Sequence, residues 1–358
     1  MHWQAFSFVS TIKSVYPAYF YDSSVIEFGS AYVNASIRSL FSNPHQYYGL
    51  DLSKTKGVDI VYDGINVFIS NNFDIALSCE CFEHNPNYLA TFENMVNHAK
   101  PGGMILFTCA TMGRAEHGTS RTTPEQSPGT QSVGIDYYKN LTKEDFNLDY
   151  IEKEFESYVF CQNRSSFDLY FVGIKKGNTK YSKSELEKNS NTIYDTVLQL
   201  EDLSFCIESL WANSTHDNAS TFLDLLVKLP VDALNPYIFE NVVGKIYSLL
   251  SNDQIDNLIT LVRRQNDIYP NVFFTYSNLY ILFREKGDFT MAHSFALKYF
   301  NESKSSLALY YLFESYISLK LPDSALKLST ENQKNLKEDA PRWILERIEL
   351  LSKKITDM

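Results

Sequence analysis

A chain of 358 residues, of which 44% are hydrophobic and 21% are charged, is long enough for two folded domains and too apolar to be disordered. The net charge of −11 is spread over both halves of the chain, and no basic block occurs, so we do not expect nucleic acid as a partner. The chain is also rich in aromatic residues, with 24 Tyr and 25 Phe, and we expect most of them to pack in cores.

The cysteines are typical of buried thiols in a reducing compartment, because they are odd in number, lack a C-x-x-C pair and lie in apolar runs. They are Cys79, Cys81, Cys109, Cys161 and Cys206. Cys79 and Cys81 have no Cys or His partner at zinc spacing, so we do not expect them to bind a metal. The N-terminus has no basic region followed by an apolar run, and no apolar run reaches about 18 residues, so we expect neither a signal peptide nor a membrane span. We predict a cytoplasmic protein.

The first predicted elements are a strand, a turn and a helix. Residues 1–24 are mixed and aromatic, typical of a helix that covers a sheet, and residues 25–29 form a short apolar strand. Gly29 provides the turn, and residues 31–41 favour a helix, as in the first unit of an open α/β sheet. The same pattern also suits a strand and helix that bind no ligand.

Asp51 ends the second predicted strand, residues 47–52. It lies 22 residues beyond Gly29, near the spacing of about 20 at which dinucleotide folds place an acid on ribose hydroxyls. The alternative role is that of a strand-end Asp that caps a turn.

Three further apolar runs continue the strand pattern: residues 58–63, 73–79 and 104–110. The middle run is largely apolar, which suits a strand buried on both faces of a parallel sheet. A helix is predicted for residues 86–99, and this alternation of strands and helices is typical of βαβ units.

A long loop follows the fifth strand, over residues 111–140, and we interpret it as an active-site lid because it leaves the ligand-binding edge of the sheet. Residues 157–161 and 167–174 then predict a closing antiparallel pair of strands. The polar stretch 175–183 breaks the pattern and marks the domain boundary.

Beyond this boundary the apolar period is helical, most clearly over residues 272–286, 289–300, 306–319 and 324–334. Ala292 and Ala325 lie 33 residues apart, close to the period of about 34 of tetratricopeptide-type arrays. We therefore predict a stacked α-hairpin layer for residues 190–358. Its aromatic residues are expected to pack between helices rather than line a peptide groove: Tyr310, Tyr311, Phe313 and Tyr316.

Four segments of the N-terminal half occur in a distinctive order. They are Val-Ile-Glu-Phe-Gly-Ser at 25–30, Tyr-Gly-Leu-Asp-Leu at 48–52, Asn-Phe-Asp-Ile-Ala-Leu-Ser-Cys-Glu-Cys-Phe-Glu-His at 72–84 and Ala-Lys-Pro-Gly-Gly-Met-Ile-Leu-Phe at 99–107. In these segments the chain resembles the class I S-adenosylmethionine-dependent methyltransferases of the methyltransferase domain 11 kind, over about residues 20–175. The resemblance implies an α/β, Rossmann-like domain of seven strands with one antiparallel strand. S-adenosyl-L-methionine would lie across the strand ends and leave as S-adenosyl-L-homocysteine.

Carried over position by position, the resemblance implies a set of cofactor-binding residues. They are Glu27, Gly29, Ser30 and Ala31 in the turn beneath the methionine part, Asp51 on the ribose, Leu52 beside the adenine, Asp63 and Gly64 at the adenine edge, and Cys79 and Glu80 beside the sulfonium.

The first turn departs from the usual G-x-G-x-G of the family, because Gly29 is followed by Ser-Ala-Tyr-Val-Asn. Ser30 and Ala31 are small enough to permit a close approach of the cofactor. Asp51 and Asp63 are both present, so we expect cofactor binding to be retained.

Methyl transfer needs alignment of the acceptor with the methyl group, and a base where the acceptor is a hydroxyl. His117 in the predicted lid is the candidate base, with an exposed loop histidine as the alternative. His84 matches the Glu-His pair of the family and is the second catalytic candidate, with a structural or substrate-positioning role. The candidates for acceptor binding all lie in the lid: Arg114, Arg121, Tyr137 and Tyr138.

The sequence thus predicts a methyltransferase domain at residues 1–178, a linker at 179–189 and an all-α, tetratricopeptide-like domain at 190–358. The first functional hypothesis is O-methylation of a small or carbohydrate acceptor, such as a sugar nucleotide, in surface polysaccharide biosynthesis. The second is N-methylation of a small amine or a protein. The third is a scaffold without catalysis, whose helical region binds a protein partner. The sequence leaves the oligomeric state open.

Overall fold

The computed structural model describes residues 2–33, 36–65, 69, 73–229, 238–239, 242–269, 272–332, 336 and 340–356. Two compact units make up the chain. Unit 1 comprises Met1–Phe205 and Val227–Leu234, and unit 2 comprises Cys206–Leu226 and Asn235–Met358.

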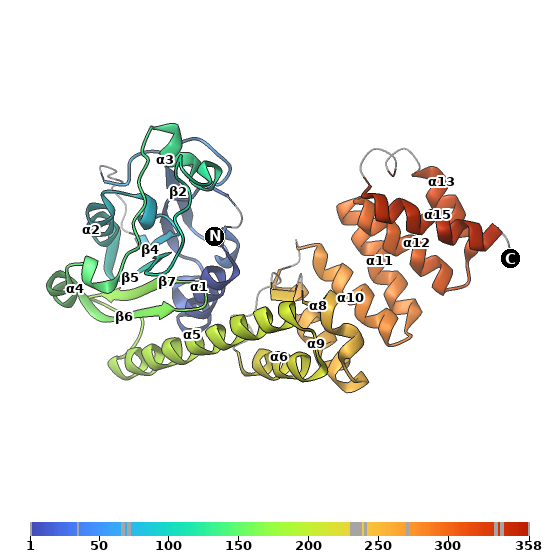
Figure 1. Ribbon diagram of the computed structural model, residues 1–358. Helices are drawn as coiled ribbons and strands as arrows, with labels where there is room; N and C mark the ends of the chain where they lie inside the picture. The colour runs from blue at the N-terminus through green and yellow to red at the C-terminus, as the bar shows by residue number, and fades with distance from the viewer. Residues whose placement is uncertain are drawn as a thin grey trace. The chain divides into compact units, whose positions relative to one another are not determined.

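Unit 1 is built on a seven-stranded sheet in the order β3-β2-β1-β4-β5-β7-β6 (Figure 1). Its strands are β1 (Ser24–Phe28), β2 (Gln46–Asp51), β3 (Ile60–Val61), β4 (Phe73–Cys79), β5 (Ala99–Ala110), β6 (Phe155–Asn163) and β7 (Asp168–Lys175). The pairs from β3 to β5 are parallel, whereas β7 runs antiparallel to both β5 and β6. The Rossmann-like sheet with one antiparallel strand is therefore confirmed.

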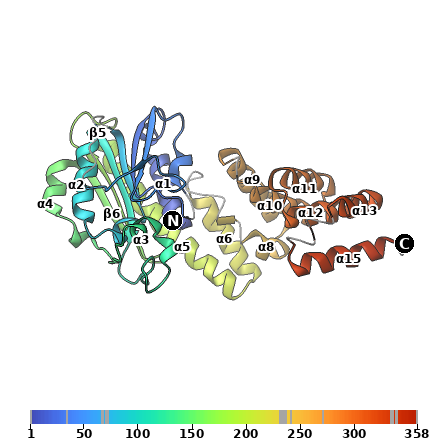
Figure 2. The same cartoon turned by 90° about the horizontal axis from the view of Figure 1, so that it is seen from above.

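Helices cover both faces of this sheet (Figures 1 and 2). On one face, Phe92 of α2 (Tyr88–His98) joins Phe107 and Phe171 of the sheet in one apolar cluster. Successive strand residues point to opposite faces, and Tyr170 accordingly stacks on Phe8 of α1 (Trp3–Val15), with ring centroids 4.3 Å apart. The predicted helix within residues 1–24 thus exists and covers the other face.

Unit 1 also contains short helices. They are the 3₁₀ turns η1 (Pro17–Tyr19), η2 (Ile37–Leu40), η3 (Phe82–His84), η4 (Pro124–Gln126) and η5 (Lys143–Asp145), and the α-helices α3 (Pro128–Ser132) and α4 (Leu148–Glu154). The long helix α5 (Lys183–Ala212) begins within the stretch predicted as a linker.

The helix predicted for residues 31–41 is wrong over the part that the structure describes, since only the 3₁₀ turn η2 forms there. Residues 34 and 35 lie outside the described residues. The backbone N–H of Ala31 donates to the Asp51 carboxylate, and that of Tyr32 donates to the Lys56 carbonyl. The segment is thus held against the loop after β2, and Ser36 then caps η2 by accepting from the Arg38 N–H.

Unit 2 is helical in all its described elements. They are α6 (His216–Lys228), α8 (Val243–Ile246), the 3₁₀ turn η7 (Tyr247–Leu249), α9 (Asn252–Ile268), α10 (Phe274–Glu285), α11 (Phe289–Ser303), α12 (Ser306–Ser318), α13 (Pro322–Glu331) and α15 (Arg342–Thr356), with α6 reaching into unit 1 at its end. Helices α9 to α13 each pack against the next along the chain. The helical C-terminal region is thus confirmed, and its tetratricopeptide-like character stays a prediction.

The predicted aromatic residues lie between the helices of unit 2. Tyr310 and Phe313 of α12 are buried in a cluster with Ala325 of α13 and Ile344 of α15, and Tyr311 and Tyr316 are packed against it. Among the described helices, none is both long and apolar enough to cross a membrane.

Candidate functional site

A pocket of about 300 Å³ lies at the carboxyl ends of β1, β2 and β4, within the usual size range of small-molecule sites. All of the predicted cofactor-binding residues line it: Glu27, Gly29, Ser30, Ala31, Asp51, Leu52, Asp63, Gly64, Cys79 and Glu80. His84, Arg114 and His117 line it as well. In open α/β sheets, ligands bind at this edge of the strands.

The turn after β1 requires glycine at its first position. Gly29 has φ +78°, and a Cβ there would lie 2.5 Å from Sγ of Cys81. The N–H groups of Gly29 and Ser30 both donate to the Leu50 carbonyl at 2.9 Å. The turn is therefore fixed to the end of β2, and its backbone forms one wall of the pocket.

Asp51 lies at the end of β2 with its carboxylate held by the backbone. Oδ2 accepts from the N–H of Ala31 at 3.1 Å, and Oδ1 accepts from the N–H of Leu52 at 2.7 Å. Burial raises the pKa of Asp51, and these N–H groups oppose the rise. Gly129 of α3 packs so closely that a Cβ there would lie 2.1 Å from Oδ1. The carboxylate keeps acceptor capacity for hydroxyls of a ligand, and a side chain at residue 129 would force it to shift.

Glu27 is a buried carboxyl on the same side of the pocket. Burial raises its pKa to about 7, although Tyr47, whose hydroxyl donates to Oε2 at 2.6 Å, lowers it. The guanidinium of Arg38 lies over the Tyr47 ring, 4.2 Å from its centroid. This carboxyl can therefore carry or release a proton near neutral pH.

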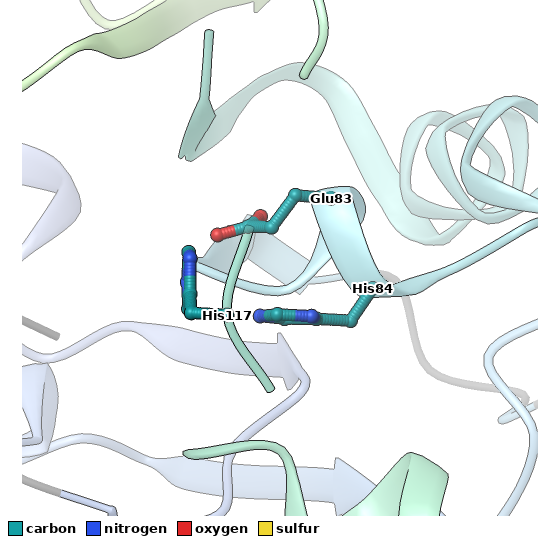
Figure 3. Close-up of side chains that lie close together, drawn as sticks. All are labelled: Glu83, His84 and His117. Carbon is teal, nitrogen blue, oxygen red and sulfur yellow. The ribbon is translucent and has the colours of Figure 1, made fainter. Parts of the chain in front are cut away.

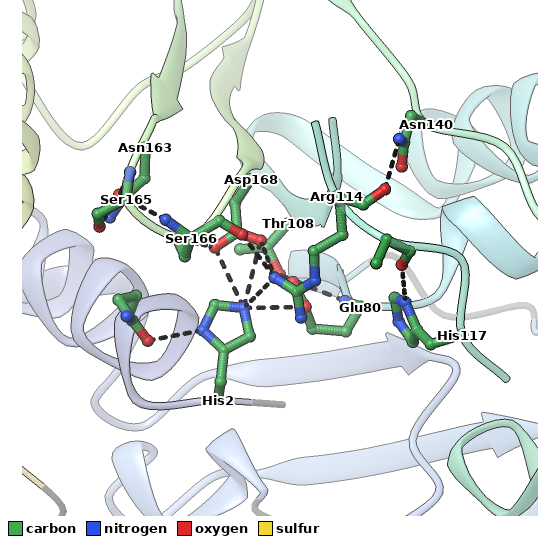
Figure 4. A network of polar contacts seen from close by, with 12 residues as sticks. His2, Glu80, Thr108, Arg114, His117, Asn140, Asn163, Ser165, Ser166 and Asp168 are labelled. Carbon is green, nitrogen blue, oxygen red and sulfur yellow. Dashed lines mark hydrogen bonds and ion pairs between the residues drawn. The ribbon is translucent and has the colours of Figure 1, made fainter. Parts of the chain in front are cut away.

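Glu80 directly follows β4 and has φ +53°, a strained conformation for a residue other than glycine. Its Oε1 accepts from the Thr108 hydroxyl at 2.8 Å, and its Oε2 lies 3.2 Å from Nε2 of His2 (Figure 4). These side-chain contacts hold the Glu80 backbone in its strained conformation, as is typical of functional positions.

His2, Asp168 and Arg114 extend this network (Figure 4), and His2 and Arg114 also line the pocket. Nε2 of His2 lies 3.1 Å from Oδ2 of Asp168, and Nη1 of Arg114 donates to Oδ1 at 3.1 Å. Burial lowers the pKa of His2, but Asp168 and Glu80 outweigh it and raise this pKa to about 10. Burial raises the pKa of Glu80, and His2 outweighs it, so that this pKa falls well below its usual value. His2 is therefore an imidazolium held between carboxylates at neutral pH.

On the wall next to the lid segment (residues 111–140), Glu83, His84 and His117 lie close together (Figure 3). Burial and the neighbouring His117 lower the pKa of His84 to about 4, and burial also lowers the pKa of His117. Both imidazoles are therefore neutral near pH 7. The Ala115 carbonyl lies 3.0 Å from Nδ1 of His117 and accepts a hydrogen bond from it, so Nδ1 carries the hydrogen and Nε2 is the unprotonated nitrogen.

The predicted acceptor-binding residues are placed unequally. Arg114 lines the pocket, but its guanidinium donates to Asp168 and to the Ser166 carbonyl. Arg121, Tyr137 and Tyr138 do not line it.

Arg121 is exposed and paired with Glu116 and Asp136 inside the lid segment. The Tyr138 ring lies edge-on to His117, with centroids 5.0 Å apart, and its hydroxyl donates to Asn140 at 2.9 Å. The Tyr138 ring therefore packs against His117, and also against His84.

Sequence reasoning missed His2, Asp168 and Glu83. His2 gave no signal, because its partners are distant in the chain. Asp168 could have been noticed as an acidic residue at the start of a mostly apolar strand. Glu83 belongs to the Glu-His pair of the resemblance, but no role was assigned to it. Such residues become apparent only when the fold brings them together.

No protein-family model and no curated protein matches the sequence. Among solved structures, the chain is similar to the N-methyltransferase NodS from Bradyrhizobium japonicum in complex with S-adenosyl-L-homocysteine, at 13% identity and a TM-score of 0.31, over 48% of this chain and 86% of NodS. It is also similar to an S-adenosylmethionine-dependent methyltransferase from Thermotoga maritima, at 14% identity and a TM-score of 0.32, over 49% of this chain and 92% of that one. Likenesses this weak assign no function, which has to come from the residues of the pocket.

Proposed function

We propose that unit 1 is an S-adenosyl-L-methionine-dependent methyltransferase. The observation that carries the proposal is the pocket itself, since every position implied to bind the cofactor lines this one cavity at the carboxyl ends of the strands. The residues fit the group: the turn at Gly29 presents backbone without bulky side chains, and Asp51 has acceptor capacity for two hydroxyls.

In this proposal S-adenosyl-L-methionine supplies an electrophilic methyl group bound to a sulfonium. Gly29, Ser30 and Ala31 position its amino-acid part, and Asp51 holds the ribose. With a hydroxyl acceptor, transfer of this methyl group from sulfur to oxygen would release the hydroxyl proton, so a proton acceptor is required. His117 is neutral near pH 7 with Nε2 unprotonated, so it can accept that proton, while His84 positions the acceptor.

The acceptor class is part of the proposal. A hydroxyl acceptor, and specifically a carbohydrate or sugar nucleotide of surface polysaccharide biosynthesis in the cytoplasm, suits a wall that carries polar groups such as His84, Asn85 and Thr130. Arg114 does not add a free guanidinium for an anionic acceptor, because it is paired with Asp168. The helical unit 2 is proposed to dock a protein partner.

Calorimetric titration with S-adenosyl-L-homocysteine tests the cofactor assignment. We expect micromolar binding by the intact protein and a loss of affinity of about tenfold or more for Asp51→Ala, because two hydrogen bonds to a charged acceptor are removed. Asp195→Ala is the matched control, since Asp195 is exposed in α5 and outside the pocket, and it should bind as the unchanged protein does. No binding by the intact protein would contradict the methyltransferase assignment and favour the scaffold hypothesis.

A further inference from the structure

Three side chains that can serve as metal ligands lie close together beside the pocket. Glu83, His84 and His117 each offer one ligand atom, and these atoms all lie within 4.8 Å of one another. Glu83 and His84 come from η3, directly after β4, and His117 comes from the lid segment. Figure 3 shows the carboxylate of Glu83 and both imidazole rings directed toward a common point.

Two residues of this group have buried polar atoms without hydrogen-bond partners among the described residues. Glu83 is 0% exposed and His84 is 5% exposed, yet no described residue bonds to Oε1 or Oε2 of Glu83 or to Nδ1 of His84. Burying such groups without compensation is unfavourable, and native proteins rarely leave them so. A cation between these ligands would satisfy the carboxylate oxygens of Glu83.

The neighbouring group of His2, Glu80 and Asp168 provides the contrast. It has similar ligand spacing, but the His2 ring lies between the two carboxylates, and Asp168 also accepts from the Ser166 and Tyr170 hydroxyls. The fold itself satisfies that group (Figure 4). In the Glu83 group, by contrast, the carboxylate oxygens have no such partner among the described residues.

The surroundings of the two histidines suit metal ligation. Metal-binding histidines usually donate their other ring N–H to a carbonyl or carboxylate, and Nδ1 of His117 does so to Ala115 at 3.0 Å. Gly118, with φ +69°, packs against the His84 ring so closely that a Cβ there would lie 2.6 Å from Cε1. Both rings are thus fixed in orientation.

We propose that Glu83, His84 and His117 form a binding site for a divalent first-row transition metal ion. Two imidazoles and one carboxylate favour ions such as Zn²⁺, Fe²⁺ or Co²⁺ over Mg²⁺ and Ca²⁺, which prefer oxygen ligands alone. His84 and His117 face the pocket, so the remaining coordination positions are open to a ligand there. The expectation of no metal, drawn from the cysteines alone, did not consider this group.

The use of such an ion rests on the proposed methyl transfer. A metal-bound acceptor hydroxyl would lose its proton more readily, so that solvent water could accept the proton and no protein base would be needed. His117 would then be a ligand through Nε2 and not the base itself.

Metal binding is measured without the cofactor, so that its failure and that of the proposed function are distinguishable. The full-length protein is stripped with a chelator and titrated with Co²⁺, followed by visible absorption, and its Zn²⁺ content is determined by elemental analysis after dialysis. We expect a single equivalent of bound metal with the absorption bands of Co²⁺ in a nitrogen and oxygen environment. Glu83→Gln and His117→Ala should each weaken binding by about tenfold or more.

The matched controls are Glu93→Gln and His45→Ala, because both residues are exposed and lie outside the group. Circular dichroism verifies that each variant is folded. If His117→Ala does not fold, the nearly isosteric Glu83→Gln variant alone tests the proposal. The proposal is overturned if the intact protein binds no stoichiometric Co²⁺ or Zn²⁺. It is equally overturned if a folded Glu83→Gln variant binds them as tightly as the unchanged protein.

Discussion

At the scale of single residues, the pocket depends on close approaches that only glycine allows. Gly29 and Gly134 both have a left-handed backbone, with φ +78° and φ +75°. A Cβ at Gly29 would meet both Sγ and Cβ of Cys81 at 2.5 and 2.6 Å, whereas a Cβ at Gly134 would meet nothing within 4 Å. The two positions therefore separate the cost of backbone conformation from the cost of crowding.

Gly29→Ala is expected to destabilise the protein by about 2–4 kcal/mol, and Gly134→Ala by about 1 kcal/mol. Both variants carry the conformational cost, but only the first also forces Cys81 to move. Urea unfolding of both variants and the unchanged protein measures the difference. Equal losses would show that the Gly29 turn has room for a side chain and that Cys81 does not hold it.

Residues whose role depends on the local chain were predictable, and residues whose role depends on distant partners were not. Gly29, Asp51 and Glu80 follow strands in a recognisable order, and the fold gathers them at one edge. His2 bonds to Asp168, 166 positions away, and no local pattern indicates such a pair. The Glu83 group also depends on the lid segment, whose path the sequence does not specify.

At the scale of elements, the buried strands were the most predictable. Residues 73–79 were predicted as a strand and form β4 with the same bounds, because a largely apolar run has few alternatives in a covered sheet. At the edge of the sheet, β3 shrinks to Ile60–Val61, since it pairs with β2 alone. The helix expected after Gly29 failed because the N–H groups of Ala31 and Tyr32 bond to the loop after β2.

Asp74 connects neighbouring elements at the opposite end of β4, and its pKa gives stability a pH dependence. Its Oδ2 accepts from the Ser24 N–H and from Lys100 Nζ, each at 3.0 Å. Burial raises the pKa of Asp74, but these donors and the Lys180 ammonium outweigh it, so the pKa is lowered on folding. A carboxyl group whose pKa is lowered on folding stabilises the protein at pH values above its pKa in the unfolded chain. This stabilisation is lost as the pH falls through the pKa of the group in the folded protein.

Asp74→Asn is therefore expected to cost about 1 kcal/mol of unfolding free energy at neutral pH, with the difference from the unchanged protein shrinking below about pH 4. Urea unfolding at neutral pH, about pH 5 and about pH 3.5 measures it. Asp195→Asn, at an exposed position in α5, is the control and should differ little from the unchanged protein throughout. A difference that stays constant, or grows, as the pH falls would refute the assigned role of the Asp74 carboxylate.

At the scale of the whole molecule, the aromatic richness of the chain divides between two separate cores. In unit 1, Phe92, Phe107 and Phe171 join the sheet to its helices, and in unit 2, Tyr310 and Phe313 join α12 to its neighbours. All residues that line the pocket belong to unit 1. Composition predicted that these rings are core residues, but only the fold shows which core each belongs to.

Phe313→Ala tests whether unit 2 contributes to the pocket. The side chain is 0% exposed and contacts the cluster of α12, α13 and α15, so its truncation should cost about 3–5 kcal/mol and lower the thermal unfolding midpoint. The affinity for S-adenosyl-L-homocysteine, measured well below that midpoint, should stay within about twofold, because Phe313 and the pocket belong to different units and residues that share no partners act independently. Phe289→Ala, at an exposed position of α11, controls for loss of an aromatic side chain and should change neither quantity. A loss of cofactor affinity in folded Phe313→Ala protein would show instead that the helical unit supports the pocket, and would make unit 2 part of the binding machinery.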